Sequence, residues 1–233
     1  MLLYKYAKVS NSISFKKRTI SKGFSFYSFS SNLKRGQFKT IDTSDISFFE
    51  SVIGKENVIK DKDELLKYNT DWLKNFIGKG KLILNPKSTS EVSKILSYCN
   101  SQRIALVPQG GNTSLCGGSV PVFDEIILNL KRMNKIINFD SISSTLHCEA
   151  GCILQTLNEY VGKQGYTMPI DLGAKGSCFI GGNLSTNAGG IHFVQHGSLR
   201  TNCKGIKAIL YSHNCRWNNN RKYVASSKKQ YRL

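Results

Sequence analysis

Hydrophobic and polar positions along the chain follow first a helical spacing and then a strand spacing. Apolar residues recur at helical intervals over 45–53, and Gly54 follows where a helix would end. The apolar run 81–85 predicts a strand that ends at Pro86. Ser88 to Glu91 has the capping-box pattern, which predicts the start of a second amphipathic helix. A helix, a strand and a capped helix are therefore expected in this order.

Short strands and helices continue to alternate beyond this point. Apolar runs predict strands at 104–107, 125–130, 135–139 and 145–150, and a helix with one apolar face follows at Ile153, Leu154, Leu157 and Val161. Turn formers at 69–71 precede Trp72, which we expect to be buried. Short mixed units with long loops at strand ends are typical of an α+β fold, rather than of a regular doubly wound sheet.

The charge of the chain is concentrated at its ends. The formal net charge is +18, of which residues 1–41 and 211–233 supply +15. Residues 42–210 carry a net charge of only +3, which is ordinary for a globular domain and lacks the excess of basic residues typical of nucleic-acid binding. The 233 residues allow one or two domains. We therefore expect no nucleic acid among the partners.

Residues 1–41 have the composition of a mitochondrial transit segment. They are rich in Ser, Lys, Arg and aromatic residues and contain no acid. Lys5 and Lys8 interrupt the only apolar stretch that a secretory signal could use, and a disordered basic tail is the alternative interpretation. No run reaches the roughly 18 apolar residues of a membrane span. We expect a protein of the mitochondrial matrix with no membrane span.

The seven cysteines are scattered and form no metal-binding pattern. No Cys-x-x-Cys pair is present, and neither Cys148 nor Cys152 has clustered histidines to complete a zinc site. Cys116 and Cys178 fall inside glycine-rich segments, where a small space-filling role is favoured over a nucleophilic one. We interpret all seven as reduced thiols.

Two glycine-rich segments, 108–118 and 173–190, contain ten of the twenty glycines. Glycine leaves backbone N–H groups uncovered, and a concave row of such groups binds phosphate oxygens without a cation. The segments lack both the Gly-Lys-Ser/Thr of a triphosphatase loop and a G-x-G-x-x-G fingerprint. Each has a Gly-Gly-Asn element with a nearby threonine, Thr113 or Thr186. These two separated elements favour an extended dinucleotide, with turns that require positive φ as the alternative.

The longer context of these segments resembles a known family. Residues 69–210 resemble the flavin-binding domain of the vanillyl-alcohol-oxidase, or PCMH, type, and within it the dehydrogenases of D-2-hydroxyglutarate and D-lactate. The resemblance rests on the runs 108–113, 117–125, 168–178 and 180–190. It implies an α+β FAD-binding PCMH-type domain of two small α+β subdomains, the second one incomplete. The expected boundaries are 1–41, 42–77 for a helical lead-in, 78–210 for the FAD domain, and 211–233 for the tail.

The same resemblance implies non-covalent FAD and assigns residues to it. Gly110 to Thr113 would lie on the pyrophosphate, and the region from Gly176 to Gly190, with Gly197 and Ser198, around the ribityl chain and flavin. Ser114, Phe179 and His196 depart from the residues usual in the family. The full set of expected cofactor-binding residues is Pro108, Gln109, Gly110, Gly111, Asn112, Thr113, Ser114, Gly117, Gly118, Gly176, Ser177, Ile180, Gly181, Gly182, Asn183, Thr186, Asn187, Ala188, Gly189, Gly190, Gly197 and Ser198.

The resemblance also implies an activity, the oxidation of a D-2-hydroxy acid, foremost D-2-hydroxyglutarate to 2-oxoglutarate, by hydride transfer to flavin N5. An electron-transfer flavoprotein would accept the electrons. The carboxylate clamp, a divalent metal site and the catalytic histidine lie in a later domain of the family, so no catalytic or metal-binding residue is expected in this chain. Lys175 is a candidate for balancing charge near the flavin. An oxidase of alcohols or sugars with the same fold, and a non-catalytic remnant of the fold, are the alternatives.

The last 23 residues differ from the rest of the chain in composition and in the pattern of apolar positions. Residues 211–233 contain no acid and show no apolar periodicity. Codons shifted by one nucleotide can spell I-I-A-D-G-T-I-I-E-N-M for 213–223 and K-N-N-T-G-Y for 228–233, which are strings that the resembled enzymes carry here. We hypothesise a one-base frame slip near Leu210. The chain as written is then expected to bind FAD weakly or not at all and to be inactive alone.

Overall fold

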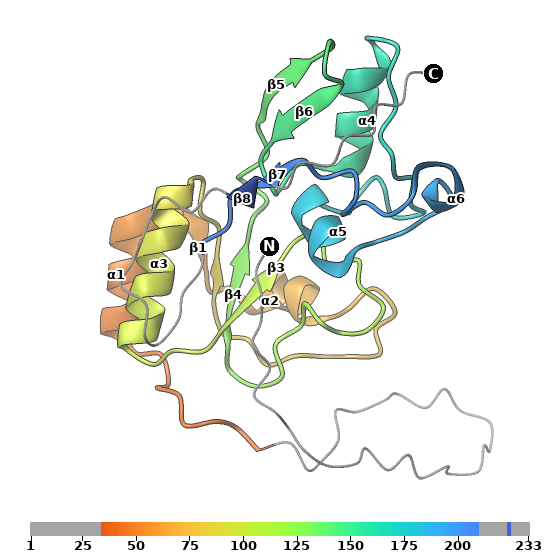
Figure 1. Cartoon of the computed structure of the whole chain (residues 1–233). Coiled ribbons are helices and arrows are strands. Elements are labelled where there is room, and N and C mark those ends of the chain that lie inside the picture. Colours follow the sequence, from red (N-terminus) through yellow and green to blue (C-terminus); the bar gives the residue numbers. More distant parts are fainter. Residues whose placement is uncertain (1–33, 210–222, 225–233) are drawn as a thin grey trace, which may run out of the picture.

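The computed structural model describes residues 34–209 and the backbone of Tyr223–Val224, and two mixed α/β units lie one above the other in Figure 1. The helices are α1 (Thr43–Ile53), the 3-10 turn η1 (Lys55–Asn57), α2 (Lys62–Asn69), α3 (Thr89–Ser101), α4 (Leu154–Gly162), α5 (Ile180–Thr186) and α6 (Phe193–His196). The strands are β1 (Val58–Ile59), β2 (Ile83–Leu84), β3 (Leu106–Gln109), β4 (Ile126–Asn129), β5 (Ile136–Asp140), β6 (Thr145–Cys148), β7 (Gly205–Ile206) and β8 (Tyr223–Val224).

The first subdomain is a four-stranded sheet between helices. The strand order is β1-β2-β4-β3, with β2, β4 and β3 parallel and β1 antiparallel at the edge. Leu84 and Leu128 face the core that α1 and α3 cover, whereas Ile83 and Ile127 face Leu65 of α2 on the other side. Side chains of a strand alternate between faces, so a sheet covered on both sides requires continuous apolar runs. This explains the unbroken 81–85 and 125–130 patterns.

The caps of α1 and α3 follow the sequence pattern with one change. Helix α1 ends at Gly54, whose φ is +86°, as its position after the apolar run predicted. Ser88 Oγ accepts a hydrogen bond from Glu91 N at 3.2 Å, as a capping box requires. Glu91 Oε2 accepts the reciprocal bond from Lys87 N, one residue before the position that the pattern predicted. Local capping chemistry therefore sets where α3 begins.

The second subdomain packs the β5–β6 hairpin against α4 and α5. Its core contains Leu154, Leu157 and Val161 of α4, three of the residues that the sequence pattern placed on one helix face. Phe139 of β5 and Tyr166 meet edge to face at 5.1 Å between ring centroids, which closes the core beside the hairpin. The apolar positions that the sequence pattern singled out in this helix therefore lie in the core of the second subdomain.

Several expectations about the ends and the surface have different outcomes. Residues 1–33, 210–222 and 225–233 lie outside the described residues, so the predictions for the transit segment and the frame slip stay predictions. Residues 34–41 are described, and Ile41 packs against the first core. The prediction of a buried Trp72 is wrong, because its side chain is 65% exposed in the loop after α2. Among the described residues, no helix has the length and apolar character needed to cross a membrane.

Candidate cofactor-binding site

The first glycine-rich segment presents a row of backbone donors at the end of β3. In the described part of the chain, no acceptor is present for the backbone N–H groups from Gly110 to Leu115. The segment is half-buried from Gly110 to Ser114, and the Thr113 hydroxyl has no partner among the described residues either. The carboxyl end of a parallel strand is where ligands bind in open α/β sheets. The geometry therefore suits an anion with several oxygens.

Hydrogen bonds from side-chain amides hold the first glycine-rich segment in place. Asn112 has φ +53°, its Nδ2 donates to Thr70 O at 2.7 Å, and its Oδ1 accepts from Ser119 Oγ at 2.7 Å. Gln109 Nε2 donates to Tyr68 O at 2.8 Å and Ser119 O at 2.9 Å. The side-chain amides of Gln109 and Asn112 therefore brace the loop through hydrogen bonds within the protein.

Asn129 of β4 adds a third brace, and this residue was not predicted. Its Nδ2 donates to Gly110 O at 2.9 Å, and its side chain is 2% exposed. The bond fixes the first peptide of the loop at the end of β3. A buried asparagine at the end of an otherwise apolar strand run was the sequence signal for this role.

The second glycine-rich segment is not a continuous loop. Residues Ile180–Thr186 form α5, which ends at Asn187 with a left-handed φ of +53°. A Cβ on Gly181 would lie 2.6 Å from the Cβ of Ala150, so this glycine allows α5 to pack closely against the chain before α4. Asn183 is buried, and its Nδ2 donates to Cys178 Sγ at 3.3 Å. Part of the glycine content here serves packing.

The two glycine-rich segments touch, whereas the sequence suggested two separate elements. A Cβ on Gly111 would overlap the carbonyl oxygen of Ser177, and one on Gly110 would lie 3.4 Å from the Cβ of Phe179. The contact brings residues 66 positions apart in the sequence onto one surface. Only a glycine at position 111 permits this close approach of the two backbones. The two glycine-rich segments are therefore in direct contact.

Other predicted residues have roles in turns or face open space. Gly118 and Gly182 have no atom within 4 Å of an added Cβ, and Gly182 N has no acceptor in the described chain. Several of the predicted residues form hydrogen bonds within their own loops and turns. Ser114 Oγ accepts from Cys116 N, Thr186 Oγ1 donates to Gly182 O, and Ser198 Oγ accepts from Thr201 N. Asn187 Oδ1 accepts from Arg200 N, and Ala188 packs in the second core.

The residues present fit a diphosphate-containing cofactor. The backbone donors from Gly110 to Leu115 and at Gly182 are uncharged and have no acceptor among the described residues, and the space beside Gly118 and Gly182 is open. Lys175, a candidate for charge balance, forms an ion pair with Asp171 at 3.1 Å and is about half exposed. No group of three potential metal ligands occurs among residues 34–209. Backbone dipoles are thus the groups on this surface that are suited to hold an anion.

The fold and this surface define an FAD-binding domain. The family model described as an FAD binding domain matches residues 80–213, more than half of the chain, and the chain belongs to this family. The helix and strand content agrees with the α+β fold expected for a PCMH-type flavoprotein.

Curated relatives sharpen the comparison. The chain is 53% identical over 177 residues to mitochondrial D-2-hydroxyglutarate dehydrogenase of Arabidopsis thaliana, covering 76% of this chain and 32% of the relative. It is 50% identical over 173 residues to the Danio rerio enzyme of the same name, with coverages of 74% and 32%. A Saccharomyces cerevisiae relative named D-2-hydroxyglutarate–pyruvate transhydrogenase is 43% identical, with coverages of 74% and 35%. The chain spans about a third of the length of these relatives.

Solved structures share the fold. Alkyldihydroxyacetonephosphate synthase matches with a TM-score of 0.65 at 17% identity, over 73% of this chain and 33% of that protein. A 4-ethylphenol oxidase from Gulosibacter chungangensis, in complex with isoeugenol, matches with a TM-score of 0.55 at 28% identity, over 63% of this chain and 29% of that protein. These matches confirm the predicted fold class.

Proposed function

We propose that this chain carries the FAD-binding part of a flavin-dependent dehydrogenase that oxidises D-2-hydroxyglutarate to 2-oxoglutarate. The observation that carries the proposal is the identity of 53% and 50% to two proteins of that name. The row of uncommitted backbone donors from Gly110 to Leu115 supports it, because FAD requires a site for its diphosphate. FAD is held without a covalent bond in this proposal.

The residues of this chain bind and orient the cofactor. When bound, FAD supplies a hydride acceptor at its N5 atom. The N–H groups from Gly110 to Leu115 hold the diphosphate, and the Thr113 and Ser177 hydroxyls are further donors on the same surface. The amides of Gln109, Asn112 and Asn129 keep the loop in its binding conformation. Gly189, Gly190, Gly197 and Ser198 are assigned to the ribityl and flavin side, together with the α5 region.

The substrate side of the reaction is assigned to the larger part of the relatives. A carboxylate clamp for the hydroxy acid, a divalent metal and a catalytic histidine are proposed there, as the resemblance to the family implies. The proposed location is the mitochondrial matrix, in line with the mitochondrial names of the Arabidopsis and Danio relatives. The proposed electron acceptor is an electron-transfer flavoprotein.

A second candidate concerns the acceptor. The name of the yeast relative indicates that pyruvate takes the reducing equivalents from D-2-hydroxyglutarate in that protein. The two candidates are separated by assaying the longer protein, read onward in the shifted frame, with D-2-hydroxyglutarate and either pyruvate or an electron-transfer flavoprotein. Formation of D-lactate with pyruvate alone would favour the transhydrogenase.

Flavin content tests the proposal directly. The longer protein is expected to copurify yellow, with one FAD per chain and turnover of D-2-hydroxyglutarate, whereas the chain of 233 residues alone binds FAD weakly. Absorbance at the flavin bands and fluorescence titration with FAD measure both. A longer protein that purifies colourless and does not respond to added FAD would contradict the proposed function.

A further inference from the structure

Residues 35–41, here called the N-terminal strap, precede α1 and are attached to the first subdomain by charged contacts. Arg35 Nε and Nη2 lie 2.5 and 3.0 Å from the two carboxylate oxygens of Asp124. Arg35 Nη1 also donates to Phe38 O at 2.6 Å, so that one guanidinium shapes the strap and fastens it. The bidentate contact with Arg35 lowers the pKa of Asp124. Asp124 lies between the first glycine-rich segment and β4.

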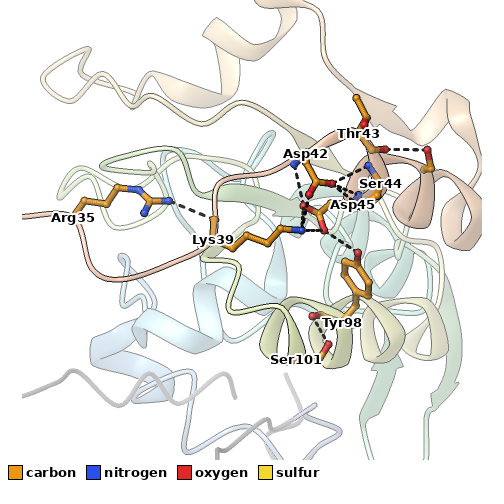
Figure 2. A network of polar contacts seen from close by, with 9 residues as sticks. Arg35, Lys39, Asp42, Thr43, Ser44, Asp45, Tyr98 and Ser101 are labelled. Atoms are coloured by element: carbon orange, nitrogen blue, oxygen red, sulfur yellow. Dashed lines mark hydrogen bonds and ion pairs between the residues drawn. The ribbon is translucent and has the colours of Figure 1, made fainter.

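The centre of the strap neutralises a buried charge (Figure 2). Lys39 Nζ lies 2.7 and 2.8 Å from the carboxylate oxygens of Asp45 and 2.8 Å from Asp42 Oδ2. The side chain of Asp45 is fully buried, and Lys39 forms its only ion pair among the described residues. Hydrogen bonds to Asp42 and then to Asp45 raise the pKa of Lys39. Removing one partner of a buried pair leaves an uncompensated charge, which is strongly destabilising.

The surroundings of Asp45 are closed on the other sides by α1 and α3. Tyr98 Oη donates to Asp45 Oδ1 at 2.8 Å, and the Tyr98 ring stacks on Phe48 at 3.8 Å between centroids. Burial, and secondly the hydrogen bond to Asp45, raises the pKa of Tyr98. Lys39 N donates to Arg103 O at 2.9 Å, which fixes the strap against the end of α3. The carboxylate therefore depends on the strap for its counter-charge.

We propose that residues 35–41 are a permanent part of the first subdomain and that the protease removing the basic N-terminal segment cuts before Arg35. The proposal rests on the mitochondrial location proposed above. Hydrolysis by a matrix processing protease adds one water across one peptide bond and leaves a new amino group at or before Arg35. A cut at residue 41, where the composition changes, would remove Lys39 and leave Asp45 buried without a cation.

Import tests the position of the cut. The full chain is incubated with energised isolated mitochondria, and the amino terminus of the protease-protected product is read by mass spectrometry. A mature terminus at or before Arg35 is expected, and a terminus at Gly36 or later would overturn the proposal. A chain that is not imported would refute the mitochondrial location instead, and the next experiment then decides the role of the strap alone.

Purified full chain tests the strap without mitochondria. Limited trypsin digestion is expected to leave a core that retains Lys39, and a core that begins at Thr40 would overturn the proposal. In urea unfolding, Lys39→Met is expected to lower the midpoint, and Asp45→Asn added to it to restore most of the loss. Lys94→Met is the matched control, because Lys94 is exposed on α3 and has no ion pair among the described residues. Equal midpoints for the two single variants would also overturn it.

Discussion

The two glycine-rich segments have similar compositions and use their glycines in different ways. Among the described residues, the backbone N–H groups of 110–115 have no acceptor, while the side-chain amides of Asn112 and Asn129 hold the loop through hydrogen bonds. In 176–190 most of the backbone is committed to α5 and its turns, and Gly181 lets α5 approach Ala150. Glycine content alone therefore does not distinguish a segment whose backbone donors are free from one whose glycines serve close packing.

The largest effect is expected from a substitution that disrupts the contact between the two segments. Gly111→Ala places a Cβ against Ser177 O, so we expect a loss of about 3 kcal/mol in the free energy of unfolding and a loss of FAD binding. Urea denaturation and fluorescence titration measure the two effects. Gly162→Ala is the control, because no atom lies within 4 Å of its added Cβ. If both variants unfold at the same urea concentration, the segments do not meet as described.

A smaller effect is expected from removing the Asn112 amide, which holds the first segment through hydrogen bonds. Asn112→Ala removes the bonds to Thr70 O and Ser119 Oγ from a residue with positive φ, and should cost about 2 kcal/mol of stability. FAD affinity should fall as well, because the donors lose their fixed directions. Asn112→Gly keeps the backbone conformation and isolates the contribution of the amide. Unchanged stability in Asn112→Gly would show that the amide does not brace the loop.

A substitution at Gly182 tests whether the second segment also contacts the cofactor. Gly182→Ala meets no atom within 4 Å and replaces glycine in α5, so stability should rise by about 0.5 kcal/mol. FAD affinity should fall if the open space beside Gly182 receives the cofactor. Thermal unfolding and FAD titration of the same longer protein separate these effects. An FAD affinity equal to that of the unsubstituted protein would remove Gly182 from the site.

The smallest expected effect is a difference in thiol reactivity. Cys116 is exposed within the first segment, whereas Cys178 is 2% exposed within the second and its pKa is raised by burial. Burial also raises the pKa of Cys99 to about 12. Only the thiolate reacts with iodoacetamide, so alkylation at neutral pH should modify Cys116 well before Cys178 and Cys99. Peptide mass spectrometry after short pulses gives the order, and early labelling of Cys178 would contradict its buried position.

Much of the fold was predictable because it depends on local patterns. The apolar runs located β2, β4 and β5 to within a residue or two, and Gly54 and Ser88 marked the end of α1 and the start of α3. The start of the first glycine-rich segment at the end of a strand also followed from the sequence. In the second segment the glycine content did not indicate a helix, because glycine has a low helix propensity. Helix α5 nevertheless forms there, and its close packing offsets that low propensity.

The sequence by itself determined the α+β fold, the first loop as a row of backbone donors and the family that these residues resemble. Only the tertiary structure decided that Gly111 meets Ser177, that Asn112 turns inward to Thr70, and that Lys39 neutralises Asp45. Helix caps and the alternation of apolar residues in strands are set by residues a few positions apart, so they can be predicted from the sequence. The partner of a buried polar group is chosen by which surfaces the packed core brings together, and no local pattern carries that information.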